Sequence, residues 1–251
     1  MIEAVLFDLS GVLYTDTGPI PGSVQAIQRI TESGIPVRYI TNTTRSHSVS
    51  ILQKLQKMGF SIDNDEIFTA PIAAKKYLIE KNLSPYCLIH PDLEMEFSDL
   101  KKEPFNAVLV GDAGQAFTYE NMNNAFRLLE TGCPLIAMGM NRYFREKDGL
   151  SLDAGPFIVA LEYAANTKAT VIGKPSPEFF RTALQSVSCK AENAVMIGDD
   201  VEADIIGALD AGLQGILVKT GKYKNGDEEK IKGRAECVDE INAAVDWILK
   251  Q

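Results

Sequence analysis

The chain has 251 residues, of which 45% are hydrophobic and 24% charged, and its formal net charge at pH 7 is −9. This composition is typical of a soluble globular protein built as one large domain or two unequal ones. The negative charge argues against a general nucleic-acid binder, and no apolar run approaches the length of a membrane helix, so we expect neither nucleic acid nor a membrane as a partner.

The N-terminal segment and the cysteines favour a cytoplasmic location. The segment MIEAVLFDLS has an acidic residue where a signal peptide has basic ones, and its apolar run is too short. The four cysteines lie far apart without a C-x-x-C pair, which predicts reduced thiols. The two histidines, His47 and His90, are too few for a multi-histidine metal site, and both are predicted to be structural.

Eight short apolar segments predict β-strands, and most are continuous rather than alternating in polarity, as in parallel strands buried on both faces. In chain order they are residues 4–9, 36–41, 86–90, 107–111, 134–139, 169–173, 194–199 and 215–220. Helical periodicity groups the apolar residues between them into four faces: Val24, Ile27 and Ile30; Ile51, Leu55 and Met58; Met122, Phe126 and Leu129; and Ile241, Val245, Ile248 and Leu249.

A further helix is predicted after Ser176, which would be its N-cap, with Pro177 at the first helical position. Repeated β–α units predict an α/β fold with a doubly wound parallel sheet. The polar segment 222–234 is predicted to be a solvated surface loop.

Polar side chains stand at the ends of four predicted strands, where open parallel sheets bind ligands. They are Asp8 with Ser10; Thr41 with Asn42; Lys174; and Asp199 with Asp200 and Asp204. Carboxylates could bind a magnesium ion. A hydroxyl, an amide and a lysine could bind phosphoryl oxygens.

Each group also has an ordinary structural interpretation. Asp199 or Asp200 could cap the following helix, Lys174 could be a solvated loop residue, and Thr41 with Asn42 could form a turn. Asp8 is harder to explain in this way, because Ser10 and Gly11 would form the turn without it. The combination, in this order and at strand ends, is more specific than any of its members.

That combination resembles the haloacid dehalogenase-like superfamily of phosphotransferases. The family's first motif is Asp-x-Asp-Gly-(Thr/Val), and DLSGV (8–12) stands in its place. Its second is a Thr or Ser at a strand end, matched by Thr41, and its third is a lysine, matched by Lys174. Its fourth is an acidic GDD…D, matched by Asp199, Asp200 and Asp204.

The resemblance covers essentially the whole chain and implies two domains. The long interval between Thr41 and Lys174 is similar to that of the NagD-like subgroup, in which an α/β cap is inserted there. It implies a doubly wound, Rossmann-like catalytic core of residues 1–70 plus 174–251 and a smaller α/β cap domain of residues 71–173. A homodimer through the cap is also implied.

The resemblance also implies the roles of the site residues. Asp8 would be the nucleophile that forms an aspartyl-phosphate. The carboxylates of Asp8 and Asp199 and the carbonyl of Ser10 would bind Mg²⁺, with Asp200 and Asp204 nearby. The substrate, a small phosphorylated molecule, would be bound by Ser10, Thr41, Asn42 and Lys174, and Lys174 would also assist catalysis.

Ser10 departs from the family pattern, which usually has a second Asp there to protonate the leaving group and activate water. General acid–base assistance is worth about 10²–10⁴-fold in rate. A serine therefore favours leaving groups that need little protonation, as in phosphoramidates, pyrophosphate and aryl phosphates. The alternative is a phosphate-binding pseudophosphatase with little turnover.

Other enzyme classes fit the sequence poorly. The segment KATVIGKPS lacks the first glycine of a P-loop and has Pro175 after its lysine. DLSGV lacks the first glycine of a serine-hydrolase elbow, and no G-x-G-x-x-G follows a strand. In the resembling subgroup, specificity lies in cap loops, here around Asn141, Arg142, Tyr143 and Asp148; Arg142 could clamp an anionic substrate or form a surface ion pair.

Overall fold

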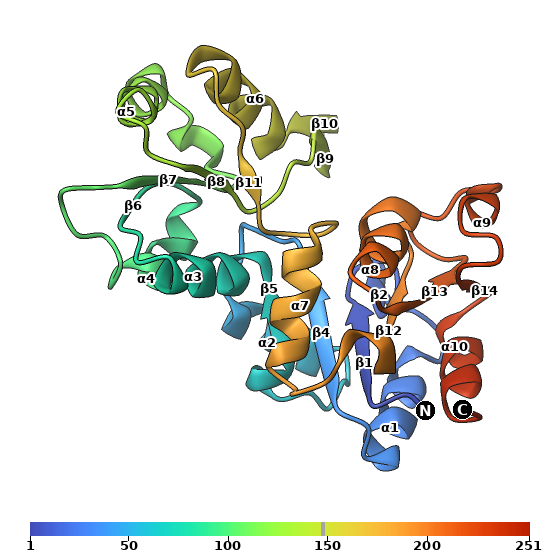
Figure 1. The fold of residues 1–251 in the computed structure, drawn as a ribbon. Helices are drawn as coiled ribbons and strands as arrows, with labels where there is room; N and C mark the ends of the chain where they lie inside the picture. The colour runs from blue at the N-terminus through green and yellow to red at the C-terminus, as the bar shows by residue number, and fades with distance from the viewer. Residues whose placement is uncertain (147–148) are drawn as a thin grey trace. The chain divides into compact units, whose positions relative to one another are not determined.

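The computed structural model describes residues 1–146 and 149–251 and divides into two compact units (Figure 1). The first unit comprises residues 1–41, 48–68 and 174–251, and the second comprises 42–47 and 69–173. The second unit is thus inserted into the chain of the first. Each unit has its own sheet and its own apolar core.

The first unit is built on a six-stranded sheet with β1 inside it. In spatial order the strands are β14 (Glu236–Val238), β13 (Gln214–Val218), β12 (Ala194–Gly198), β1 (Ala4–Asp8), β4 (Val37–Thr41) and β5 (Ile67–Thr69). The pairs from β14 to β4 are parallel, and the chain winds outward from β1 in both directions. This is the predicted α/β doubly wound arrangement.

The helices of this unit bury residues against the sheet, with one exception. They are α1 (Ser23–Ser33), α2 (Ser48–Lys57), α7 (Pro177–Gln185), α8 (Gly207–Asp210), α9 (Asp227–Lys230) and α10 (Ile241–Ile248). The exception is α9, which has no buried residue. The main core joins the buried faces of α1 and α10 to β1 and β4, where the rings of Phe7 and Tyr39 stack with centroids 5.9 Å apart. β1 and β12 are buried along their whole length. A short hairpin, β2 (Tyr14–Thr15) and β3 (Gly18–Pro19), follows β1.

The second unit has a four-stranded parallel sheet of its own. Its strands, in spatial order, are β11 (Thr170–Val171), β8 (Leu135–Ala137), β7 (Ala107–Val110) and β6 (Pro85–Leu88). Figure 1 shows α5 (Tyr119–Leu129) and α6 (Ala154–Ala164) over one face, and α3 (Ala70–Glu80) and α4 (Glu94–Phe97) over the other. An antiparallel hairpin, β9 (Tyr143–Glu146) and β10 (Gly149–Leu152), precedes α6.

The eight predicted strands are all present, as β1, β4, β6, β7, β8, β11, β12 and β13. Met58 and Leu249 each lie one residue beyond the end of their helix, α2 and α10. Met58 still packs against the core that contains Ile51 and Leu55, as predicted, whereas Leu249 is 40% exposed, so its place on the apolar face was wrong. Ser176 is the N-cap of α7 and Pro177 its first residue, as predicted, although the Ser176 side chain accepts no capping hydrogen bond.

The segment 222–234 is more ordered than a solvated loop. It contains α9, and Ile231 within it is only 1% exposed because it packs against Val201, Ile205 and Leu217. The four cysteines are free thiols. Within residues 1–146 and 149–251, no helix has both the length and the apolar character needed to span a bilayer.

Candidate active site

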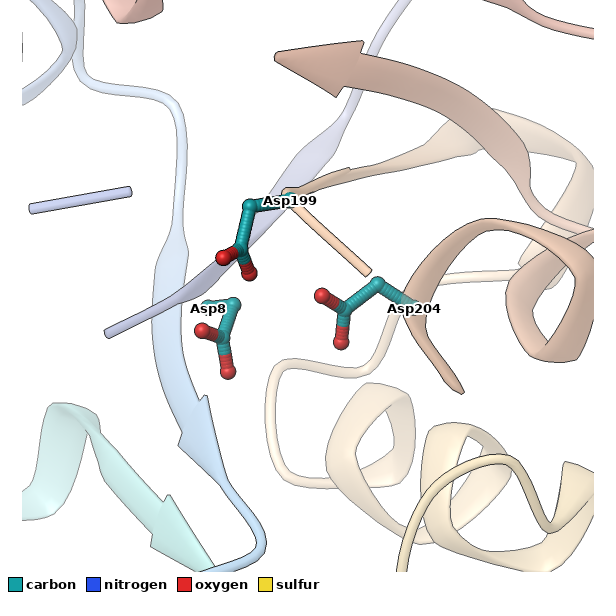
Figure 2. A group of neighbouring side chains, drawn as sticks. All are labelled: Asp8, Asp199 and Asp204. Atoms are coloured by element: carbon teal, nitrogen blue, oxygen red, sulfur yellow. The ribbon is translucent and has the colours of Figure 1, made fainter. Parts of the chain in front are cut away.

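Three aspartates from the first unit meet at the carboxyl end of its sheet. Asp8 is the last residue of β1 and Asp199 follows the neighbouring parallel strand β12, so their side chains emerge at the same edge. Figure 2 shows their carboxylates beside that of Asp204. Each residue offers one oxygen within 4.8 Å of the others, and the three are between 1% and 8% exposed.

Lys174 places a single buried ammonium group among these carboxylates. Its Nζ donates to Asp204 Oδ1 at 2.7 Å and to Asp8 Oδ1, and the residue is 5% exposed. Burial alone would lower the pKa of Lys174, but the charges of Asp204 and Asp8 outweigh it and raise that pKa. Lys174 is therefore held as a cation, as a phosphate-binding or charge-neutralising role requires.

The cluster holds more acid than this one ammonium group can neutralise. Burial and the charges of Asp8 and Asp204 raise the pKa of Asp199 to about 7, and burial also raises the pKa of Asp204. A divalent cation with oxygen ligands would balance the excess when all three carboxylates are ionised. The donor set therefore fits the predicted magnesium ion.

Backbone hydrogen bonds shape the turn that follows Asp8. Gly11 N donates to Tyr14 O at 2.7 Å, and Leu13 N donates to Leu9 O at 2.9 Å. Gly11 has a φ of +92°, and a Cβ there would collide with the Asp199 carboxylate, so only glycine fits. Ser10 is the exposed residue of this turn, two positions from Asp8.

Asp200 serves as a helix cap, the ordinary interpretation considered above. Its Oδ1 accepts from Glu202 N at 3.2 Å and from Ala203 N at 3.0 Å. Burial alone would raise the pKa of Asp200, but the hydrogen bond from Ala203 N and the charge of the Lys222 ammonium outweigh it and lower that pKa. Asp204, in a π-helical segment (Val201–Ile206), joins Asp8 and Asp199 instead.

The predicted phosphate-binding pair at the end of β4 is divided between the two units. Thr41 is the last residue of β4, whose Ile40 lies opposite Asp8 in the sheet. Asn42 is the next residue in the chain and the first residue of the second unit, and its side chain lies against Gly173. The structure thus brings Asp8, Lys174, Asp199 and Asp204 together, with Thr41 on the strand next to Asp8.

The predicted specificity residues lie around the start of β9 in the second unit. Asn141 hydrogen-bonds through its side chain to Asp153, which caps α6. Arg142 is exposed, and Tyr143 is 57% exposed. Asp148 lies outside the described residues.

Sequence reasoning missed one segment that contacts the acidic cluster, residues 220–222. Lys222 N donates to Asp199 Oδ2 at 2.6 Å, and Thr220 Oγ1 donates to Gly11 O. The available signal was the Thr-Gly pair just after an apolar strand, β13, the same kind of strand end that marked the other site residues.

Comparison with known proteins identifies the family. Residues 5–101 match the model described as haloacid dehalogenase-like hydrolase, and residues 171–244 match a second model of the same kind, HAD-hydrolase-like. The two matched segments contain Asp8, Lys174 and the Asp199–Asp204 stretch.

Two relatives are similar over most of their length. The human haloacid dehalogenase-like hydrolase domain-containing protein 2 is 46% identical over 92% of this chain and 89% of its own. The human phospholysine phosphohistidine inorganic pyrophosphate phosphatase is 43% identical over 99% of this chain and 95% of its own.

Solved structures share the fold at lower identity. The 4-nitrophenylphosphatase of Thermotoga maritima matches with a TM-score of 0.89 and 24% identity, covering 98% of this chain and 97% of its own. NagD from E. coli K-12 matches with a TM-score of 0.88 and 23% identity, covering 96% and 97%. The predicted fold and enzyme class are confirmed, and the chain belongs to the haloacid dehalogenase-like hydrolases.

Proposed function

We propose that this hydrolase is a magnesium-dependent phosphatase that works through an aspartyl-phosphate on Asp8. One observation carries the proposal: Asp8 lies in a buried group of three carboxylates that contains a single ammonium group, at the carboxyl end of a parallel sheet. Such a group has a nucleophile, a cation site and a counter-charge within a few ångströms of one another.

The magnesium ion would be held by the carboxylates of Asp8 and Asp199 and by the carbonyl of Ser10. When bound, it would supply positive charge to the phosphoryl oxygens during transfer. Asp204 orients Lys174 by accepting its hydrogen bond at 2.7 Å. Asp200 holds the start of the helical segment that carries Asp204.

In the first step, a carboxylate oxygen of Asp8 would bond to phosphorus while the bond from phosphorus to the leaving group breaks. The leaving group departs with the electron pair and takes up a proton from solvent. Lys174, and Thr41 with Asn42 in the assembled site, would bind the phosphoryl oxygens. Water then attacks phosphorus and loses a proton to solvent, the bond to Asp8 breaks, and phosphate is released with the carboxylate restored.

Ser10 defines the substrate class that we propose. A serine hydroxyl is a poor general acid at neutral pH, so both steps lack the usual proton transfer group. Small molecules whose leaving group needs little protonation fit this site best: phosphoramidates, pyrophosphate and aryl phosphates. Two names among the similar proteins are compatible with this class. One relative is named a phospholysine phosphohistidine inorganic pyrophosphate phosphatase, and one protein of the same fold is named a 4-nitrophenylphosphatase.

A substrate panel at fixed magnesium tests the proposal. Wild-type protein should hydrolyse a phosphoramidate, pyrophosphate and 4-nitrophenyl phosphate faster than sugar phosphates, by up to about 10²–10⁴-fold. Asp8→Asn should lose all of these activities. Equal rates for aryl and sugar phosphates, with the chemical step limiting, would contradict the assigned substrate class.

Inactivity toward every activated substrate, with magnesium bound and Asp8 intact, would instead favour a phosphate-binding pseudophosphatase.

We also propose that the second unit acts as the cap of this enzyme, following the predicted division at residues 70 and 174, and that copies of the chain pair through it. The cytoplasmic location stays a prediction from the sequence.

A further inference from the structure

We propose that residues 220–222, here called the clasp, position the magnesium ligand Asp199 and fix it to the turn that follows the nucleophile. This inference rests on the proposed function, because it assigns a role in binding the same cation. The clasp begins two residues after the end of β13, while Asp8 is the last residue of β1 and Asp199 follows β12. The three segments are adjacent because these strands are neighbours in the sheet.

Two hydrogen bonds connect the clasp to the other two segments. Lys222 N donates to Asp199 Oδ2 at 2.6 Å, which fixes the rotation of that carboxylate. Thr220 Oγ1 donates to the carbonyl oxygen of Gly11, in the turn that also contains Ser10. The clasp therefore holds the Asp199 side chain and the turn after Asp8 in one arrangement.

Close backbone packing adds to these hydrogen bonds. Gly221 has a φ of +55°, and a Cβ on it would collide with Asp199 Oδ2 and with the Cα of Gly11. A Cβ on Gly11 would collide with the same oxygen. Asp199 Oδ2 is thus enclosed between two glycines, where any side chain atom at either position would force the carboxylate to move.

The side chain of Lys222 extends the clasp to the next acidic residue. Its Nζ lies 3.2 Å from Asp200 Oδ2, and this side chain is 70% exposed. An exposed ion pair of this kind contributes little, so the backbone N–H of Lys222, rather than its charge, is the group we assign to positioning. Outer hydrogen bonds of this sort typically change metal affinity by about 10–100-fold when they are lost.

Magnesium binding to the full-length protein, measured by isothermal titration calorimetry, tests the clasp without relying on turnover. Gly221→Ala should weaken binding by about 10-fold or more. Gly233→Ala is the matched control, because Gly233 also has a positive φ, +72°, but has open space around its Cβ position. It carries the same kind of backbone strain, and its magnesium affinity should stay within about 2-fold of wild type.

A second pair of variants separates positioning from general stability. Thr220→Val removes the hydroxyl with little change in shape and should weaken binding, whereas Thr220→Ser keeps the hydroxyl and should restore it. If Gly221→Ala fails to fold, this pair decides the question. Normal magnesium affinity in both Gly221→Ala and Thr220→Val would overturn the clasp.

Asp199→Asn distinguishes a failure of the clasp from a failure of the proposed function. Loss of binding in Asp199→Asn, with normal binding in the clasp variants, would refute the clasp and leave the metal site standing. Undiminished binding in Asp199→Asn would show that the metal site itself is wrongly placed, and the clasp proposal would fall with it.

Discussion

Replacing Lys174 with methionine should strongly destabilise the first unit in the absence of magnesium. The change removes the buried ammonium group that donates to Asp8 and Asp204, while keeping a side chain of similar length. Removing one partner of a buried ion pair typically costs about 3–5 kcal/mol, because the remaining charge stays buried without compensation. For a chain of this size, that corresponds to a fall in Tm of about 6–20 °C.

Urea unfolding in the presence of a chelator measures this cost. The single tryptophan, Trp247, packs against the core of the first unit, so its fluorescence reports on the unit that contains Lys174. Lys232→Met is the matched control, since Lys232 is 77% exposed and its ion pair with Glu229 spans 3.3 Å. That variant should lose no more than about 1 kcal/mol.

The loss of unfolding free energy must be larger for Lys174→Met than for Lys232→Met if the buried charges are as described. A loss for Lys174→Met as small as that of Lys232→Met would mean that Lys174 is not the main counter-charge of the cluster. The interpretation of the site as a buried, cation-demanding group of carboxylates would then be wrong.

Three further predictions concern other features of the molecule. Arg38 donates to Ser186 Oγ at 2.7 Å and to Ser186 O at 2.8 Å, so Arg38→Leu should lower the unfolding free energy measured by urea titration by about 2–4 kcal/mol. Arg29→Leu is the control, because Arg29 forms an exposed ion pair, and it should lower that free energy by no more than about 1 kcal/mol. Ser10→Asp should raise the rate on sugar phosphates relative to aryl phosphates, measured as the ratio of kcat/KM values; an unchanged ratio would argue against the role of this position in protonation. Burial raises the pKa of Cys87 to about 12, so its alkylation, followed by peptide mass spectrometry, should still increase about tenfold per pH unit between pH 8 and 11, and a plateau near pH 9 would contradict this.

The parallel strands were predictable because burial on both faces makes them continuous apolar runs. β14 escaped prediction because its residues are exposed or half-buried, so no apolar run marks it. β5 is buried, but it passes into α3 at Ala70 without a turn to mark its end. The hairpin of β9 and β10 escaped because Tyr143, Leu150 and Leu152 are exposed, so its apolar residues face no core.

The helices also divide into those that the sequence pattern predicted and those that it missed. α1, α5 and α10 have one apolar face, and their periodicity was readable. α3 and α6 were missed because apolar residues occur all round them, which removes the contrast between faces that periodicity detects.

The predicted site residues came from strand ends, and the structure brings Asp8, Lys174 and Asp199 together there. Spacing could not show that Asp204, rather than Asp200, joins the carboxylate group, because this depends on the π-helical path of residues 201–206. The clasp could not be predicted either. Its contact between Gly11 and Gly221 joins residues far apart in the sequence, and only the order of strands in the sheet brings them together.

Trapping the covalent intermediate tests the central claim most directly. The wild-type protein would be mixed with magnesium and 4-nitrophenyl phosphate, quenched in the steady state, reduced with borohydride and analysed by peptide mass spectrometry. Borohydride reduces an acyl phosphate to an alcohol, so the account predicts homoserine at position 8, and unmodified peptide from Asp8→Asn treated in the same way. Phosphate release at the wild-type rate from protein that carries no modification at Asp8, or carries it on another residue, would contradict the account.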